Sequence, residues 1–97
     1  MRHSLAWGLA RYEIDRVTPG GFLLAVLQND LIAAVGKADS ENRGRLAEIV
    51  AWVYNNVPSC CYGSKAKVEA WLLGETEVDS GYADRARRRY AEIGVVL

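Results

Sequence analysis

The spacing of apolar residues along the chain predicts helices rather than strands. In the segment 21–36 the apolar side chains fall on every side of a helix, and only Gln28, Asn29 and Asp30 interrupt them. A helix that is apolar all round in a short chain is expected at the centre of the fold. We therefore expect a central helix over residues 21–36 that ends at Gly36 and is wrapped by the other helices.

A first helix is predicted from about Ser4 to Asp15, with apolar residues on two faces, so that it is sandwiched between other elements or lies at an oligomer contact. The segment Thr18-Pro19-Gly20-Gly21 separates it from the central helix, because proline disfavours the helical conformation in the residue before it. A third helix begins at Asp39 or Ser40 and ends before Pro58. Its expected core stripe consists of Leu46, Ile49, Val50, Val53 and Val57.

Two more helices complete the pattern. Ser64 can cap a fourth helix that ends at Gly74, and Asp79 or Ser80 can cap a fifth near the end of the chain. The fifth helix keeps helical spacing at Tyr82, Ala86, Tyr90 and Ile93. No stretch of any length alternates in the manner of a strand. The predicted fold is a single all-α domain over residues 1–97, a compact bundle of about five helices around the central apolar helix.

Composition and charge limit the classes of function. Of the 97 residues, 51% are hydrophobic and 25% are charged, which is typical of a globular domain. Twelve Lys and Arg residues balance twelve Asp and Glu residues, so no net field draws the protein to nucleic acid or to an anionic membrane. No apolar run approaches the roughly 20 residues of a membrane span, and the N-terminal segment lacks the pattern of a secretory signal. We expect a cytoplasmic protein without a membrane partner.

The sequence offers little for catalysis or metal binding. Cys60 and Cys61 are neighbours, which form a disulfide only through a strained ring, so both are expected as free thiols that fill space. His3 is the only histidine, and no cysteine or carboxylate stands near it at the spacing of a metal ligand. The residues of a catalytic constellation are missing. We expect no catalytic residue, no metal and no cofactor.

Asp30 is the one carboxylate on an otherwise apolar segment, and we expect it to be partly buried. A buried carboxylate survives by pairing with an arginine or by accepting backbone N–H bonds. The candidate arginine partners are Arg11, Arg16 and Arg43. No second carboxylate stands beside Asp30 at helical spacing, so this residue is interpreted as structural.

Two lysines suggest a candidate anion site. Lys65 and Lys67 stand in the first turn of the fourth helix, after Ser64, where free backbone N–H groups could join them around an anion or a phosphate. The alternative is that both lysines are simply solvated.

The cluster Arg85–Arg89 resembles a nucleic-acid patch, but helical i, i+4 pairing accounts for much of it as a solvated helix face. The expected pairs are Asp84–Arg88 and Arg88–Glu92. The third and fourth helices can also be drawn as a helix-turn-helix, whose reading helix, residues 64–73, offers only two lysines to DNA. We expect no sequence-specific nucleic acid partner, and a small helix-turn-helix DNA-binding regulator is the alternative function.

Trp52 lies off the expected core stripe of the third helix, on a polar face. A tryptophan in this position is either covered by the first helix or a tail, or exposed as an anchor for a protein partner. Together with two arginines of the fifth helix, this face supplies the candidate partner-binding residues. They are Arg45, Glu48, Trp52, Asn56, Arg87 and Arg88.

A string of short motifs extends over about residues 11 to 73. It consists of Arg11-Tyr12, Gly20-Gly21-Phe22-Leu23, Ala25-Val26-Leu27, Asn29-Asp30-Leu31, Ala34-Val35-Gly36, Ala38-Asp39, Asn42, Glu48-Ile49-Val50, Trp52, Tyr54-Asn55, Pro58, Cys61, Gly63-Ser64, Lys67-Val68 and Trp71-Leu72. In these motifs the chain resembles a family of small proteins encoded by bacteriophages and prophages. Lys65 departs from the proline that often follows Gly-Ser in that family, and Cys60 and the tail from Glu75 onward are peculiar to this chain.

The resemblance implies a phage-encoded protein in the cytoplasm of a bacterial host, and it carries over no functional residue. A neutral, single-domain phage protein without catalytic residues is most simply a binder of a host protein or protein complex. By analogy with phage proteins that counter host defences, the leading hypothesis is an anti-CRISPR inhibitor of a CRISPR-Cas effector. A homo-oligomer is compatible with the sequence.

Stability is predicted to be independent of metals and of a disulfide, because His3, Cys60 and Cys61 cannot assemble a conventional site. A chelator and a reductant should each leave the melting temperature unchanged in a thermal scan followed by circular dichroism. A decrease of several degrees with either reagent would contradict this expectation.

Overall fold

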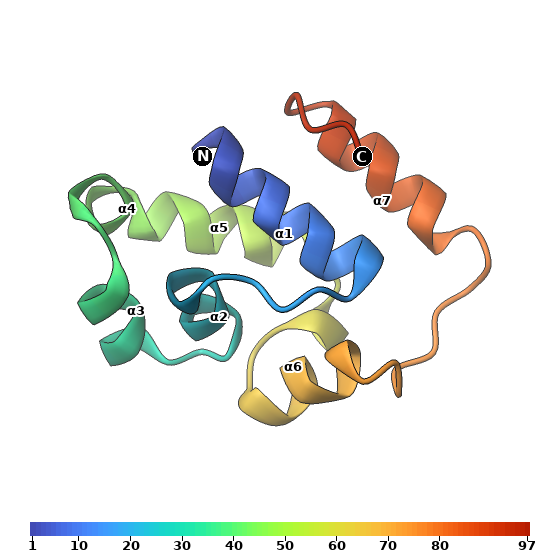
Figure 1. Ribbon diagram of the computed structural model, residues 1–97, viewed down its shortest axis with the longest axis horizontal. Coiled ribbons are helices and arrows are strands. Elements are labelled where there is room, and N and C mark those ends of the chain that lie inside the picture. Colours follow the sequence, from blue (N-terminus) through green and yellow to red (C-terminus); the bar gives the residue numbers. More distant parts are fainter.

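The computed structural model describes residues 1–97 and contains seven α-helices, one short 3-10 helix and no strand (Figure 1). The predicted all-α class is therefore confirmed, although the chain forms more helices than the sequence predicted. The elements are α1 (His3–Asp15), α2 (Gly21–Leu27), α3 (Leu31–Lys37), α4 (Ser40–Gly44), α5 (Leu46–Asn56), η1 (Ser59–Cys61), α6 (Lys65–Leu72) and α7 (Tyr82–Ala91).

The central element is α1 rather than the segment 21–36. Figure 1 shows α1 running across α5 with α7 beside it. Both neighbours contribute to the same core cluster as α1, for example through Val53 of α5 and Tyr90 of α7. The buried residues of α1 are Ala6, Leu9, Ala10, Tyr12 and Glu13. The prediction that the first helix is sandwiched between other elements is thus confirmed.

The prediction of one continuous helix over residues 21–36 is wrong, because the chain breaks at its polar triplet. Asn29 adopts the left-handed conformation with a φ of 62°, and its N–H donates to the carbonyl of Val26 at 3.1 Å. The N–H of Asp30 donates to the carbonyl of Ala25 at 2.9 Å, which completes a Schellman motif at the end of α2. The Asp30 carboxylate then caps α3 by accepting a hydrogen bond of 3.1 Å from the Ala33 N–H.

The break places α3 on the surface. Leu31 and Ile32 are 64% and 87% exposed, so this half of the segment does not lie at the centre of the fold. Asp30 is exposed as well, which contradicts its expected burial. Its carboxylate accepts the Ala33 N–H at the start of α3 and has no arginine partner. The three candidate arginines have other partners: Arg11 pairs with Asp15, Arg16 donates to the carbonyl of Trp71, and Arg43 donates to the carbonyl of Ala38.

The predicted third helix also divides into two. α4 begins after Asp39, which caps it by accepting a hydrogen bond of 2.8 Å from the Asn42 N–H. α5 then starts anew at Leu46 and ends before Pro58, as predicted. The core face of α5 departs from the expected stripe, because Val50 is 45% exposed. One apolar side chain of α5 is therefore turned towards solvent.

The start of α7 differs from the prediction. The residue before this helix is Gly81, which has no side chain to cap it, so neither Asp79 nor Ser80 serves as the N-cap. Asp79 instead forms an ion pair with Arg85, with Oδ2 at 2.9 Å from Nη1. The helix is therefore held at its start by a side-chain pair rather than by a backbone cap.

α6 begins and ends as the sequence predicted. Ser64 caps the helix by accepting a hydrogen bond of 3.1 Å from the Lys67 N–H. The chain leaves the helix through Gly74, whose φ of 72° lies in the left-handed region that favours glycine. Between these two points Trp71 is fully buried in the main core cluster.

Hydrogen bonds fix the end of α1 to η1 and α6. Trp71 Nε1 donates to the carbonyl of Tyr12 at 3.1 Å, and the Tyr12 hydroxyl donates to the carbonyl of Cys61 at 2.7 Å. Arg16, in the left-handed conformation, donates to the carbonyl of Trp71 at 2.8 Å and lies 3.6 Å above its ring. Each buried polar atom in this junction has a partner, as a stable core requires.

Glu13 attaches α7 to α1. Its carboxylate is completely buried and accepts two hydrogen bonds, of 2.7 and 2.8 Å, from the guanidinium of Arg89. The hydroxyl of Tyr90 donates to it at 2.7 Å, and the hydroxyl of Tyr82 donates as well. Burial raises the pKa of both tyrosines, and the nearby carboxylate raises it further, so both remain protonated donors. A buried charge is tolerated here because four donor atoms surround it.

Replacement of Glu13 by Gln should lower the free energy of unfolding by about 3 kcal/mol, because Arg89 then loses its partner inside a low-dielectric junction. Urea unfolding followed by circular dichroism measures this change. Asp84→Asn is the matched control, since its exposed carboxylate pairs only with Arg87 at 3.4 Å, and we expect a change below about 0.5 kcal/mol. Equal small effects of both substitutions would contradict this role of Glu13.

Candidate protein-interaction surfaces

One aromatic pair brings together the two helices that carry the predicted partner-binding residues. The rings of Trp52 on α5 and Tyr90 on α7 lie 5.5 Å apart between centroids, at an angle of 39°. Trp52 is half-buried and packs against the main core cluster. Tyr90 of α7 covers part of the ring, so Trp52 lies between the two expected alternatives of a covered and an exposed side chain. We call the six predicted residues together the α5–α7 surface: Arg45, Glu48, Trp52, Asn56, Arg87 and Arg88. No hydrogen bond or ion pair joins the two arginines of α7 to the other four.

The polar residues of this surface on and beside α5 differ in whether the protein itself supplies them with a hydrogen-bond or ion-pair partner. The side-chain amide of Asn56 donates to the carbonyl of Trp52 at 2.9 Å. Glu48 lies 3.7 Å from the N-terminal ammonium of Met1. Arg45 is exposed and has no carboxylate within ion-pair distance. Arg45, which directly precedes α5, is therefore free to meet a partner.

The arginine cluster of α7 is mostly neutralised. Its ion pairs are Arg85 with Asp79, Arg87 with Asp84 and Arg89 with Glu13. Arg88 is exposed and has no carboxylate partner. The expected pairs Asp84–Arg88 and Arg88–Glu92 are wrong, because Asp84 reaches Arg87 instead, one position earlier on the helix. The cluster thus presents one unpaired cation rather than a basic patch.

The candidate anion site at the start of α6 is partly occupied by the protein's own groups. The hydroxyl oxygen of Ser64 serves as the helix cap. Lys67 Nζ donates to the carbonyl of Ser59 at 3.2 Å, and Lys65 Nζ lies 3.9 Å from the carboxylate of Glu69. Both lysines are exposed. This arrangement is typical of a capped surface helix and favours the alternative of solvated lysines.

The two cysteines are free thiols whose sulfur atoms lie 4.0 Å apart. Cys61 is completely buried, which fits its expected role as a filler, and Cys60 is half-buried. Burial raises the pKa of the Cys61 thiol, and the neighbouring Cys60 raises it further, so Cys61 is a poor nucleophile. No group of three or more His, Cys, Asp and Glu side chains is placed to hold a metal ion.

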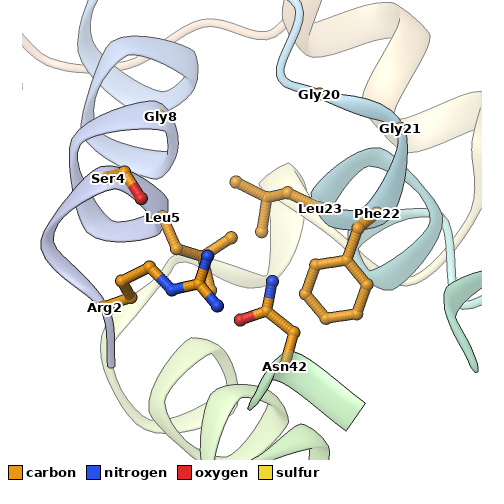
Figure 2. A pocket seen from close by; sticks show the side chains of 9 residues that line it. All are labelled: Arg2, Ser4, Leu5, Gly8, Gly20, Gly21, Phe22, Leu23 and Asn42. Atoms are coloured by element: carbon orange, nitrogen blue, oxygen red, sulfur yellow. The ribbon is translucent and has the colours of Figure 1, made fainter. Parts of the chain in front are cut away.

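A hollow of about 270 Å³ lies between α1, α2 and α4 (Figure 2). Figure 2 shows the side chains of Arg2 and Asn42 turned towards each other across it. The guanidinium of Arg2 is 2.9 Å from Asp39 and 2.6 Å from Glu41, so two carboxylates more than balance its charge. The volume is below the roughly 300 Å³ at which ligand pockets begin. This hollow therefore does not favour an anion or a drug-sized ligand.

A second exposed surface, which the sequence did not predict, lies on α3 and α5. We call it the α3–α5 face and define it by five apolar side chains: Leu31, Ile32, Val35, Val50 and Tyr54. Two hollows of about 170 and 210 Å³ adjoin it, and both are lined by Val26, Asn29 and Val50. Tyr54, which is 73% exposed, stands at the second hollow. Asp30 is the only charged residue that lines either hollow.

Comparisons of the chain with protein-family models, with curated proteins and with solved structures found no match. The helices of the structure are too short or too polar to cross a membrane. The surfaces described above are therefore the basis on which a function can be argued.

Binding to duplex DNA is predicted to be weak and independent of sequence, because ion pairs neutralise three arginines of α7 and leave Arg88 alone. Fluorescence anisotropy with a labelled random duplex at physiological salt should show no saturation at micromolar protein. A sequence-specific complex that forms at nanomolar protein would contradict this and favour the regulator.

Proposed function

We propose that this protein acts by binding another protein and that it is not an enzyme. The proposed partner is a host protein or protein complex in the cytoplasm of a bacterium, and the leading candidate is a CRISPR-Cas effector that the protein inhibits. The resemblance to phage-encoded proteins supports the host setting. The absence of a catalytic constellation among the exposed side chains supports binding rather than catalysis.

The observation that carries the proposal is the fixed position of the Trp52 ring, which is only partly buried. Tyr90 packs on this ring, and the Tyr90 hydroxyl is itself bound to the buried Glu13 at 2.7 Å. An aromatic side chain that is already held in place loses little conformational freedom when it binds. Tryptophan, tyrosine and arginine are also the residues that most often dominate binding energy at protein interfaces. Trp52 therefore has the features of an interface anchor.

The charges of the α5–α7 surface indicate which partner groups it can accept. Arg45 and Arg88 are exposed and lack carboxylate partners, so each can form a charge-assisted hydrogen bond with an acidic residue of another protein. The proposed partner surface thus combines an apolar recess for the Trp52 ring with carboxylates at its edge.

The alternative function, a small helix-turn-helix regulator, has less support. α5, η1 and α6 follow one another in the order that this motif requires. However, Lys67 is bound to the carbonyl of Ser59 and Lys65 lies beside Glu69, so α6 offers few free cations to DNA.

The test of the proposal uses phage plating and binding together. A bacterium with an active CRISPR-Cas system should become sensitive to a targeted phage when it expresses the protein, and the purified effector complex should bind it in biolayer interferometry. Trp52→Ala and Arg88→Ala should each weaken binding about tenfold or more and restore immunity. Arg88→Ala should keep the normal melting temperature, whereas Trp52→Ala should lower it by several degrees, because the ring also packs on Tyr90.

Trp7→Ala is the matched control, because Trp7 is an exposed tryptophan of α1 that lies outside the α5–α7 surface and makes a cation–π contact with Arg11. This variant should bind like the unchanged protein. Loss of binding in all three variants would indicate a general effect on folding. Unchanged binding in both Trp52→Ala and Arg88→Ala would show that the α5–α7 surface is not the partner-binding site. The start of α6, with Ser64, Lys65 and Lys67, would then be the remaining candidate.

A further inference from the structure

The exposed apolar residues of this protein are not evenly distributed. Five of the twelve exposed large apolar residues belong to the α3–α5 face, and the other seven lie on α1, in the segments between helices and in the C-terminal segment. The two hollows connect three of the five residues, because Leu31 and Val50 line the first and Val50 and Tyr54 line the second. Ile32 and Val35 lie on the same short helix as Leu31. A contiguous apolar surface of this kind on a small protein marks a site of association.

The shape of the face is complementary to itself. Leu31 and Ile32 project from the first turn of α3 as a ridge, since Ile32 is 87% exposed. Leu31 of this ridge lines the hollow of about 170 Å³, and the hollow of about 210 Å³ follows at Val50 and Tyr54. They are smaller than ligand pockets, which begin at roughly 300 Å³, so they suit single side chains. A ridge next to a hollow is the arrangement that a two-fold contact needs, because each copy then supplies both halves.

We propose that the occupant of the α3–α5 face is a second copy of this chain, in a two-fold symmetric dimer. The ridge of one copy, Leu31 and Ile32, fills the hollow beside Val50 and Tyr54 of the other copy. The same contact is repeated across the axis. This inference does not depend on the proposed host partner, which uses a different surface.

The area of the face fits a weak dimer. Weighted by their exposed fractions, the five side chains offer on the order of 500 Å² of apolar surface. Two copies together therefore bury on the order of 1,000 Å², which is near the lower limit for a specific interface and below the standard size. Interfaces near this lower limit are typical of weak, transient association, so the dimer is expected to form only at high protein concentration.

Neither the charge of the chain nor the arrangement of its helices opposes a second copy. The net charge of the chain is zero, so two copies do not repel each other at long range. Asp30 is the only charged residue that lines the hollows, and it is exposed, so it can stay in water at the edge of the contact. Figure 1 shows α3 and α7 at opposite ends of the molecule. A dimer through α3 and α5 thus carries its two α7 helices at its outer ends.

Sedimentation velocity of the full chain, at concentrations from about 10 µM to about 500 µM, tests this proposal. The unchanged protein should shift from monomer to dimer over this range. Ile32→Asp should remain monomeric at every concentration, with an unchanged melting temperature because the side chain is almost fully exposed. Val96→Asp is the matched control, since Val96 is 83% exposed but lies in the C-terminal tail, and it should dimerise normally.

A mixing experiment tests the pairing itself. Tyr54→Lys alone should also be monomeric, but an equimolar mixture of Ile32→Asp and Tyr54→Lys should recover the dimer, because one of the two contacts is intact and the other joins opposite charges. The proposal is overturned if the unchanged protein stays monomeric at about 500 µM. It is equally overturned if Ile32→Asp still dimerises, or if the mixture of the two variants does not recover the dimer.

Discussion

The buried carboxylate of Glu13 is the interaction on which the arrangement of the C-terminal third depends. The chain between α6 and α7 is mostly exposed, so it does little to place the last helix. Arg89, Tyr90 and Tyr82 instead bring α7 to α1 through the Glu13 oxygens. Because Tyr90 also packs on Trp52, the same carboxylate sets the position of the tryptophan at the candidate interface.

A second constraint comes from the polar triplet Gln28, Asn29 and Asp30. The hydrogen bonds of the Schellman motif and of the Asp30 cap end α2 and start α3 within three residues. As a consequence α2 stays in the core while α3 carries Leu31 and Ile32 into solvent. The exposed apolar face is therefore a product of local backbone chemistry rather than of an incomplete core.

Local signals in the sequence predicted local structure well. The caps at Ser64 and Asp39, the end of a helix before Pro58 and the break at Pro19 depend on neighbouring residues, and the structure has all of them. Apolar spacing also predicted the all-α class. The same spacing was misleading over residues 21–36, because apolar periodicity does not reveal a turn when its capping residues are short polar side chains that a helix also tolerates.

The candidate site was less predictable, because it depends on contacts between distant residues. Trp52 was identified from its position off the core stripe. The residue that packs on its ring, Tyr90, lies 38 positions further along the chain, and no sequence pattern indicates that the two rings meet. Glu13 was missed although it is completely buried, since its partners lie on α7. The only feature of the sequence that indicates a buried carboxylate here is a glutamate directly after Tyr12 on a helix with two apolar faces. Amide hydrogen exchange of Glu13→Gln tests the central claim most directly: the amides of α7 should lose about tenfold or more protection beyond any loss at α6, because α7 then opens locally without the rest of the core. Unchanged protection throughout α7 would contradict the account.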